Sequence, residues 1–259
     1  MNKYTQKGAT LIVVLVLLVV ITVIGTMAIR QSMVSLSVAT NAQVQQLLVQ
    51  NSDAALYRIE DQKTVVRNLA RDGMFGYLRG VNNKNKELVF CYRADQSNLN
   101  FFQLTRASIV EWASGDTAPK NTALGSNGFC QISSSGSDNF FTSGRKLVMT
   151  QVAVKYSTVA NDQPFKHSAR GTDTKSAKID ETEKVNVYSV SVMPALSTAS
   201  TTDINACLRN KMNEVTVPES DVVVTIPTDS KVSVTACLTA LNVPFTTQVS
   251  EYTIVQAFN

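Results

Sequence analysis

The sequence predicts an α+β fold in which one long N-terminal helix precedes an antiparallel β-sheet domain with long loops. No charged residue lies between Lys7 and Arg30, and apolar residues recur at helical spacing as far as Ile59. After Gly73 the pattern changes to the alternation of β-branched and aromatic residues that is typical of strands. The 259 residues are 44% hydrophobic and 17% charged, which supports a packed core and excludes collagen-like, repetitive and wholly disordered classes.

The first 30 residues predict a membrane-spanning helix. Of the 21 residues from Ala9 to Ile29, only Thr10, Thr22, Gly25 and Thr26 fall outside the apolar set. Such a helix is about 31 Å long, close to the hydrocarbon core of a bilayer at about 30 Å. Lys3 and Lys7 precede it and favour a cytoplasmic N-terminus. A cleaved secretory signal and a plain single-pass anchor are the alternatives for this segment.

The same helix is expected to continue well beyond the bilayer. Residues 31–52 contain no charge, and the first proline is Pro119. A helix carried to Ile59 would be about 75 Å long, and its latest stop is at Gly73 in a left-handed C′ conformation. A polar but uncharged helix surface favours burial against other helices, where unpaired charge is costly. The apolar stripe comprises Met33, Val34, Leu36, Val38, Val44, Leu47, Leu48, Ala55, Leu56 and Ile59.

The segment Lys7-Gly8-Ala9-Thr10-Leu11-Ile12-Val13 resembles the class III leader and N-terminal helix of type IV pilins. A short basic leader ends in glycine, an apolar run starts at once, and a long helix follows. The resemblance implies cleavage by prepilin peptidase between Gly8 and Ala9, N-methylation of Ala9, and storage in the membrane before filament assembly. It divides the chain into a leader (1–8), a long helix (9–72, with a transmembrane half at 9–29) and a periplasmic or extracellular β-rich globular domain (73–259).

Val13 departs from the usual pilin pattern, which carries glutamate at the fifth mature position. In the family that glutamate is thought to neutralise the N-terminal amine of a neighbouring subunit within the apolar filament core. Without it, the pattern looks most like PilX-type minor pilins and next like the K-type minor pseudopilin of type II secretion. Both are placed near the filament tip in the family picture.

The resemblance implies partners and a location. The partners are other minor and major pilins, prepilin peptidase, the inner-membrane assembly platform and a large tip adhesin. The chain would lie in the bacterial inner membrane before assembly and at the extracellular pilus tip afterwards. It would prime pilus assembly and support adhesion, twitching or DNA uptake. A periplasmic binding domain on a single-pass anchor is the alternative from another class.

The globular part is expected to be a sheet with long loops. Residues 151–156 and 184–190 are expected to pair as a hairpin across the polar segment 157–183, which is either a partner-contact loop or, preferably, a tolerated insertion. Glycine and serine mark 113–146 as irregular and inserted before the main sheet. The expected strands are 88–92, 147–156, 185–193, 222–226, 231–236 and 252–258.

Four cysteines, Cys91, Cys130, Cys207 and Cys237, lie on the side of the membrane that the leader implies is oxidising. None forms a C-x-x-C motif, so disulfides are preferred over a metal site. Four cysteines allow three pairings, and the order of the expected elements favours Cys91 with Cys130 and Cys207 with Cys237. The second closed loop resembles the disulfide-bounded loop of pilins.

No residue pattern points to an enzyme, a cofactor or a metal. His167 is the chain's one histidine and stands beside Lys166 in a polar loop, where a solvated surface role is expected. Asp180, Glu181 and Glu183 lack the alternating spacing of a calcium loop. Trp112 and the pair Phe101-Phe102 are expected in the core or at a sheet edge. The formal charge of +4 is spread without a basic block, so nucleic-acid contact is not expected.

Overall fold

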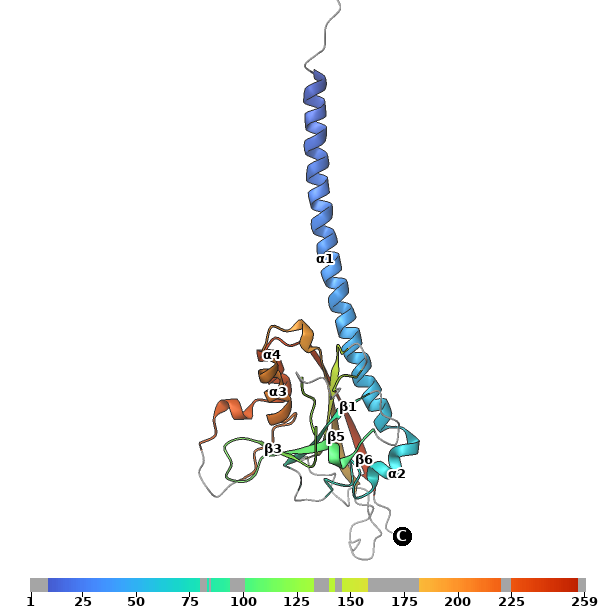
Figure 1. The fold of residues 1–259 in the computed structure, drawn as a ribbon, viewed down its shortest axis with the longest axis vertical. Coiled ribbons are helices and arrows are strands. Elements are labelled where there is room, and N and C mark those ends of the chain that lie inside the picture. The colour runs from blue at the N-terminus through green and yellow to red at the C-terminus, as the bar shows by residue number, and fades with distance from the viewer. Residues whose placement is uncertain are drawn as a thin grey trace, which may run out of the picture. The chain divides into compact units, whose positions relative to one another are not determined.

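The computed structural model describes residues 9–79, 83, 85–93, 101–132, 140–142, 146–157, 182–219 and 225–255. Within these ranges the chain is α+β, as the sequence predicts, with one long helix followed by a six-stranded antiparallel sheet (Figure 1). The chain divides into two compact units, Met1–Gln46 and Leu47–Asn259. The expected leader Met1–Gly8 and most of the 157–183 loop lie outside the described residues.

The first helix, α1, runs without interruption over Ala9–Ile59. It ends earlier than the latest predicted stop, because Asp61 begins a second helix, α2 (Gln62–Leu69), with a side chain that accepts a hydrogen bond from the backbone N–H of Lys63 at 3.0 Å. Aspartate is a favoured helix N-cap, so Asp61 in the sequence indicates the start of a new helix.

Gly73 does not adopt the predicted left-handed conformation. Its role is steric, since a Cβ placed there would lie 2.2 Å from the carbonyl oxygen of Arg67 and 2.4 Å from that of Asn68. The turn after α2 therefore folds back onto the end of that helix, and only glycine permits so close an approach.

The sheet has the strand order β3-β2-β1-β4-β5-β6, and every neighbouring pair is antiparallel. The expected hairpin is confirmed, with Gln151 opposite Val190 and Tyr156 opposite Val185. The strands are β1 (Lys86–Tyr92), β2 (Ala107–Glu111), β3 (Lys120–Ala123), β4 (Met149–Tyr156), β5 (Thr182–Val192) and β6 (Phe245–Val255).

Several expectations about the sheet differ from the structure. The segment expected as a strand at 231–236 enters helix α4 (Val234–Ala240), whose N-cap Ser233 accepts from the backbone N–H of Ala236. A short alternating run does not by itself distinguish a strand from a buried helix. The region 113–146 is not inserted before the sheet, because it lies between β2 and β4 and contributes β3. The last strand begins at Phe245, earlier than the expected start at Tyr252. Of the expected strand 222–226, residues 222–224 lie outside the described residues, and Thr225 and Ile226 are not in a strand.

The sheet of the second unit is covered on both faces. One face packs against the end of α1 and residues 74–78, through side chains such as Leu88, Phe90 and Val154. The other face packs against α3 (Thr201–Asn210) and α4, through Met149, Val190 and Val192. Figure 1 shows the last turns of α1 on one side of the strands and α3 with α4 on the other. Short 3₁₀ turns lie at Leu104–Arg106, Pro194–Leu196 and Thr228–Lys231.

Candidate functional site

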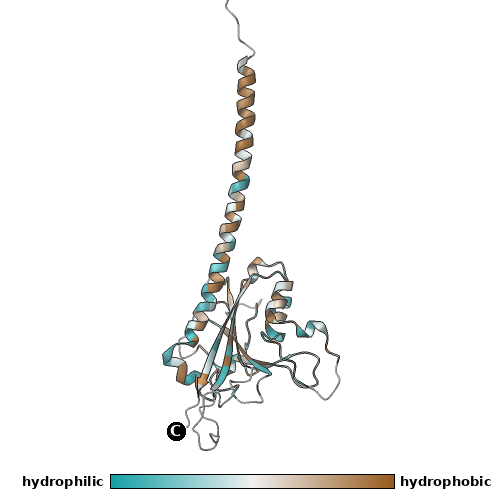
Figure 2. Cartoon of the chain, turned by 180° about the vertical axis from the view of Figure 1, so that it is seen from behind, coloured by the Kyte–Doolittle hydropathy of each residue, from teal (hydrophilic) through white to brown (hydrophobic). Residues whose placement is uncertain are grey.

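The most unusual surface of the described residues is the N-terminal part of α1. Every large apolar side chain between Leu11 and Ile29 is at least 45% exposed, with Leu11 at 71% and Val13 at 58%. Figure 2 shows this part of the helix as almost continuously hydrophobic. Full burial of a Val, Leu or Ile side chain is worth about 1.5–3 kcal/mol. The surface is therefore unsuited to water and requires lipid or other apolar helices around it.

The polar groups in this part of α1 are satisfied inside the helix. The hydroxyl of Thr22 donates to the carbonyl oxygen of Val19 at 2.8 Å, and that of Thr26 donates to Val23 at 2.9 Å. A membrane offers no water to satisfy polar atoms, so such internal bonding suits a bilayer. Among the described helices, α1 alone is long and apolar enough to cross a membrane by length and composition.

Beyond the bilayer-length segment and Arg30, α1 carries no charge until Asp53 and keeps apolar side chains at its surface. Met33, Leu36 and Val38 are 67%, 65% and 63% exposed. They alternate with glutamine, serine and asparagine, and Figure 2 shows the hydropathy along the helix becoming mixed. A surface of this kind can pack against other helices of the same composition without burying unpaired charge.

The last turns of α1 belong to the globular unit through one buried stripe. Leu48, Ser52, Ala55 and Ile59 are at most 2% exposed and follow one another at steps of four, three and four residues, which places them on one helix face. The three apolar members fill the core, and the polar member, Ser52, meets the sheet through hydrogen bonds.

The hydroxyl of Ser52 donates to the Ser191 hydroxyl at 2.8 Å, and the Ser189 hydroxyl donates to the Ser52 carbonyl oxygen at 3.3 Å. The Ser191 and Thr150 hydroxyls are also 2.8 Å apart. These small side chains let the helix approach β4 and β5 closely while every buried hydroxyl in the cluster keeps a partner.

The residues expected for processing lie at the start of α1. Ala9 is the first helical residue, and Gly8 lies outside the described residues. Val13 stands in the first turns, within the exposed apolar surface, so no carboxylate occupies the position where pilins usually carry one.

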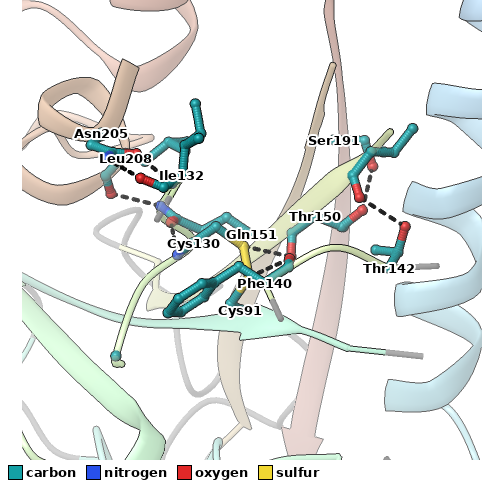
Figure 3. Close-up of a disulfide and its surroundings, with 12 residues drawn as sticks. Cys91, Cys130, Ile132, Phe140, Thr142, Thr150, Gln151, Ser191, Asn205 and Leu208 are labelled. Carbon is teal, nitrogen blue, oxygen red and sulfur yellow. Dashed lines mark hydrogen bonds between the residues drawn. A yellow bond between two sulfur atoms is a disulfide. The ribbon is translucent and has the colours of Figure 1, made fainter. Parts of the chain in front are cut away.

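Both disulfides have the pairing favoured by the order of elements along the chain. Cys91 on β1 bonds to Cys130, with a Cα–Cα distance of 4.8 Å. Figure 3 shows the amide of Gln151 beside this bond, where its Oε1 accepts from the N–H of Cys130 at 3.1 Å and its Nε2 donates to the carbonyl oxygen of Leu208 at 2.8 Å. Asn205 on α3 also bonds both backbone groups of Ile132. The segment after Cys130 is thereby held between β4 and α3.

The second disulfide joins α3 to α4 through Cys207 and Cys237, with a Cα–Cα distance of 5.7 Å. Ser200 caps the start of α3. Its hydroxyl accepts a hydrogen bond from the backbone N–H of Asp203 at 3.1 Å and donates one to the Asp203 carboxylate at 2.7 Å. The loop that the disulfide closes is thus bounded by two short helices that pack on the sheet.

Sequence reasoning missed a buried charged cluster on the same face of the sheet. Glu87 on β1 and Lys155 on β4 are both 0% exposed, and the register that pairs Leu88 with Val154 places them opposite each other. The Glu87 carboxylate accepts from the backbone N–H groups of Asn213 and Glu214, each at 2.9 Å, and from Asn213 Nδ2 at 3.2 Å. A charge inside each of two apolar strands was the signal that could have found this pair.

Lys155 completes the cluster by donating to the Glu214 carbonyl oxygen and the Thr216 hydroxyl. Tyr188 donates to the Glu214 carboxylate at 2.7 Å. Burial raises the pKa of Glu87, and the ammonium of Lys155 and the backbone N–H groups oppose this shift. Burial lowers the pKa of Lys155, and the two carboxylates oppose it. The cluster fixes the segment after α3 to the sheet.

The other residues singled out in the sequence are structural or lie outside the described ranges. Trp112 is fully buried and its indole N–H donates to the Asp116 carbonyl oxygen at 2.9 Å. Phe101 and Phe102 pack edge-on against Phe90. Glu183 forms an ion pair with Arg79 at 3.0 Å. His167, Asp180 and Glu181 are outside the described residues, within which no cluster of three or more metal-ligating side chains occurs.

The helix α1 thus combines an apolar segment of bilayer length with last turns that pack in a disulfide-containing sheet domain. Residues 7–56 match the PilX N-terminal family model. The match covers α1 almost to its end and does not extend to the sheet. No curated protein and no solved structure matches the chain.

Proposed function

We propose that the chain is a minor type IV pilin that primes pilus assembly at the filament tip. The observation that carries this is the exposed surface of α1, which carries no charge but Arg30 from Ala9 to Ser52, within a segment that matches the PilX N-terminal family. In the membrane this surface contacts lipid, and in the filament it contacts the helices of other pilins. The same side chains serve both environments because both are apolar.

The position in the filament follows from charge. A subunit of the shaft receives the positive N-terminal amine of a neighbour in an apolar core, where an unpaired charge is costly. Val13 supplies no carboxylate for that amine. The tip subunit needs none at this position, because it has no further subunit beyond it. Adhesion, twitching or DNA uptake would then depend on the tip through this subunit and its partners.

Processing precedes assembly in this proposal. Prepilin peptidase removes residues 1–8, which takes Lys3 and Lys7 from the chain, and Ala9 becomes the methylated N-terminus. The assembly platform of the inner membrane then extracts the subunit together with other minor pilins.

A photocrosslinking amino acid at Leu36, in the exposed outer half of α1, tests the proposal in cells that carry the pilus genes. The expected result is a crosslink to α1 of another pilin in sheared filaments, at far fewer copies than the major pilin. The matched control carries the same crosslinker with Gly8→Val, which keeps the leader attached and should yield no filament crosslink. Crosslinks to a secretion pseudopilin instead would assign the chain to a type II secretion system, and absence from both would contradict the proposal.

A further inference from the structure

The strand β6 forms one edge of the sheet, where β5 pairs with one of its two sides. It pairs with β5 over all eleven residues from Phe245 to Val255. It is last in the strand order, so no strand of the described residues lies on its other side. Open edges of this length are uncommon, because their unpaired backbone groups readily pair with another chain.

The register shows which backbone groups face outward. The N–H of Met193 donates to the carbonyl oxygen of Pro244 at 2.9 Å, so this pair is of the hydrogen-bonded type. Hydrogen-bonded pairs alternate along an antiparallel ladder. The backbone groups of even-numbered residues therefore point to β5, and those of Thr247, Val249, Glu251 and Thr253 point away from it. No backbone hydrogen bond joins these four to any other described residue.

The opposite edge of the sheet is protected. The strand β3 has only four residues, and its Lys120 is ion-paired with Asp116 at 2.7 Å. The side chain of Asn121 on this strand donates to the carbonyl oxygen of Arg209 on α3 at 3.0 Å. By contrast, β6 contains no proline and one charged residue, Glu251. The features that usually prevent edge pairing are present at β3 and missing along β6.

An apolar groove lies beside the second half of β6. Its volume is about 350 Å³, and the end of α1, α2 and β6 form its walls. Glu60 lies at the groove and accepts a hydrogen bond from the Tyr252 hydroxyl at 2.9 Å. Its lining residues are Ile59, Glu60, Val65, Leu69, Phe75, Tyr252, Thr253 and Ile254.

We propose that the edge of β6 binds an extended segment of a partner protein as a seventh strand, with an apolar side chain in the groove and a lysine or arginine facing Glu60. The outward N–H and C=O groups supply affinity, and the groove selects the side chains. The Glu251 carboxylate, also on β6, is already ion-paired with Lys184 at 3.2 Å, so Glu60 is the acidic group at this site for a partner's cation. A second copy of β6 is a poorer occupant, because β6 contains no lysine or arginine to face Glu60. This inference is independent of the filament position proposed above.

The probe is a fluorescein-labelled peptide, Lys-Thr-Ile-Thr-Val-Thr-Val-Lys, titrated by fluorescence anisotropy against the full chain in lipid nanodiscs. Saturable binding is expected, with none to empty nanodiscs. A peptide of the same sequence, N-methylated at alternate residues on the side that faces β6, should bind at least tenfold more weakly. Equal binding of the two peptides, or no saturable binding of the first, would overturn the proposal.

Two pairs of variants locate the site. Thr253→Pro removes one outward N–H without removing a bond to β5 and should weaken binding at least tenfold, whereas Thr253→Val should leave it within about twofold. Leu69→Lys should weaken binding by placing a cation at the groove, and Leu69→Met should not. Thermal unfolding of each variant shows whether the domain is intact. If Thr253→Pro binds as the parent does, or if sedimentation shows that the unmodified chain self-associates through β6, the proposed occupant is wrong.

Discussion

The buried pair Glu87 and Lys155 gives the sharpest test of how the globular domain is held together. Replacing Lys155 by methionine removes the ammonium but keeps a side chain of similar length. Both residues are 0% exposed, and Lys155 interacts electrostatically with Glu87 and is ion-paired with Glu214 at 3.8 Å, so the change removes the buried cation that offsets the Glu87 carboxylate. Breaking a buried pair in this way costs about 3–5 kcal/mol. Three hydrogen bonds from Asn213 and Glu214 remain on Glu87, which places the loss near 3 kcal/mol.

The assay is thermal unfolding of the full chain in detergent, followed by near-ultraviolet circular dichroism. For a domain of about 150–250 residues, each kcal/mol shifts Tm by about 2–4 °C, so Lys155→Met should lower Tm by roughly 6–12 °C. The double variant Glu87→Gln, Lys155→Met has no buried charge and should recover most of the loss. The reasoning is refuted if Lys155→Met lowers Tm by less than about 2 °C, or if the two single changes simply add.

The pH dependence of Lys155→Met has a definite sign. Burial raises the pKa of Glu87, and losing the ammonium of Lys155 raises it further. A carboxyl whose folded pKa lies above its unfolded value stabilises the fold fully below the unfolded pKa, and this contribution is lost as pH rises through the folded pKa. The variant should therefore lose more stability relative to the parent at pH 8 than at pH 5. An equal loss at both values would contradict this assignment.

Three other predictions concern separate parts of the chain. Gly73→Ala should lower the free energy of unfolding of the domain by about 2 kcal/mol or more, because the new Cβ would lie 2.2 Å from the Arg67 carbonyl oxygen. Gly25→Ala is the control, because the space around Gly25 is open. Equal Tm values for the two variants would contradict the close approach at Gly73. Replacing Cys207 and Cys237 by serine removes a disulfide between residues that are 30 positions apart. The free energy of unfolding, measured in denaturant, should fall by about 3–4 kcal/mol relative to the oxidised parent. Val13→Glu should leave the sheet domain unchanged by circular dichroism but alter filament number or composition; unchanged filaments would count against a tip position.

The long helix and the central hairpin could be predicted because their sequence signals are local and repeated. The stripe at Leu48, Ala55 and Ile59 repeats at helical spacing, and the β-branched runs of β4 and β5 alternate over enough residues to fix both strand type and partner. Ser52 carries no apolar signal, so its bonds to the sheet could not be inferred before the partner strands were placed.

The errors arose where short segments depend on tertiary contacts. The strand β3, with the sequence Lys-Asn-Thr-Ala, is polar and mostly exposed, and it is a strand because β2 pairs with it. The helix α4 contains two β-branched residues near its start, yet Ser233 caps it and Cys237 bonds it to α3. Of the candidate site, the apolar surface of α1 was evident from the sequence, whereas the Glu87 and Lys155 pair needed the register of two strands far apart in the sequence.

The mature N-terminus tests the central claim most directly, since every step of the proposed function follows leader removal. The chain is purified from the membrane fraction of cells that contain prepilin peptidase, and its N-terminal peptide is sequenced by mass spectrometry. The account predicts a chain that begins at Ala9 with a methyl group on its amine. A chain that retains Met1 or Asn2 would contradict it and would favour a domain on a simple membrane anchor.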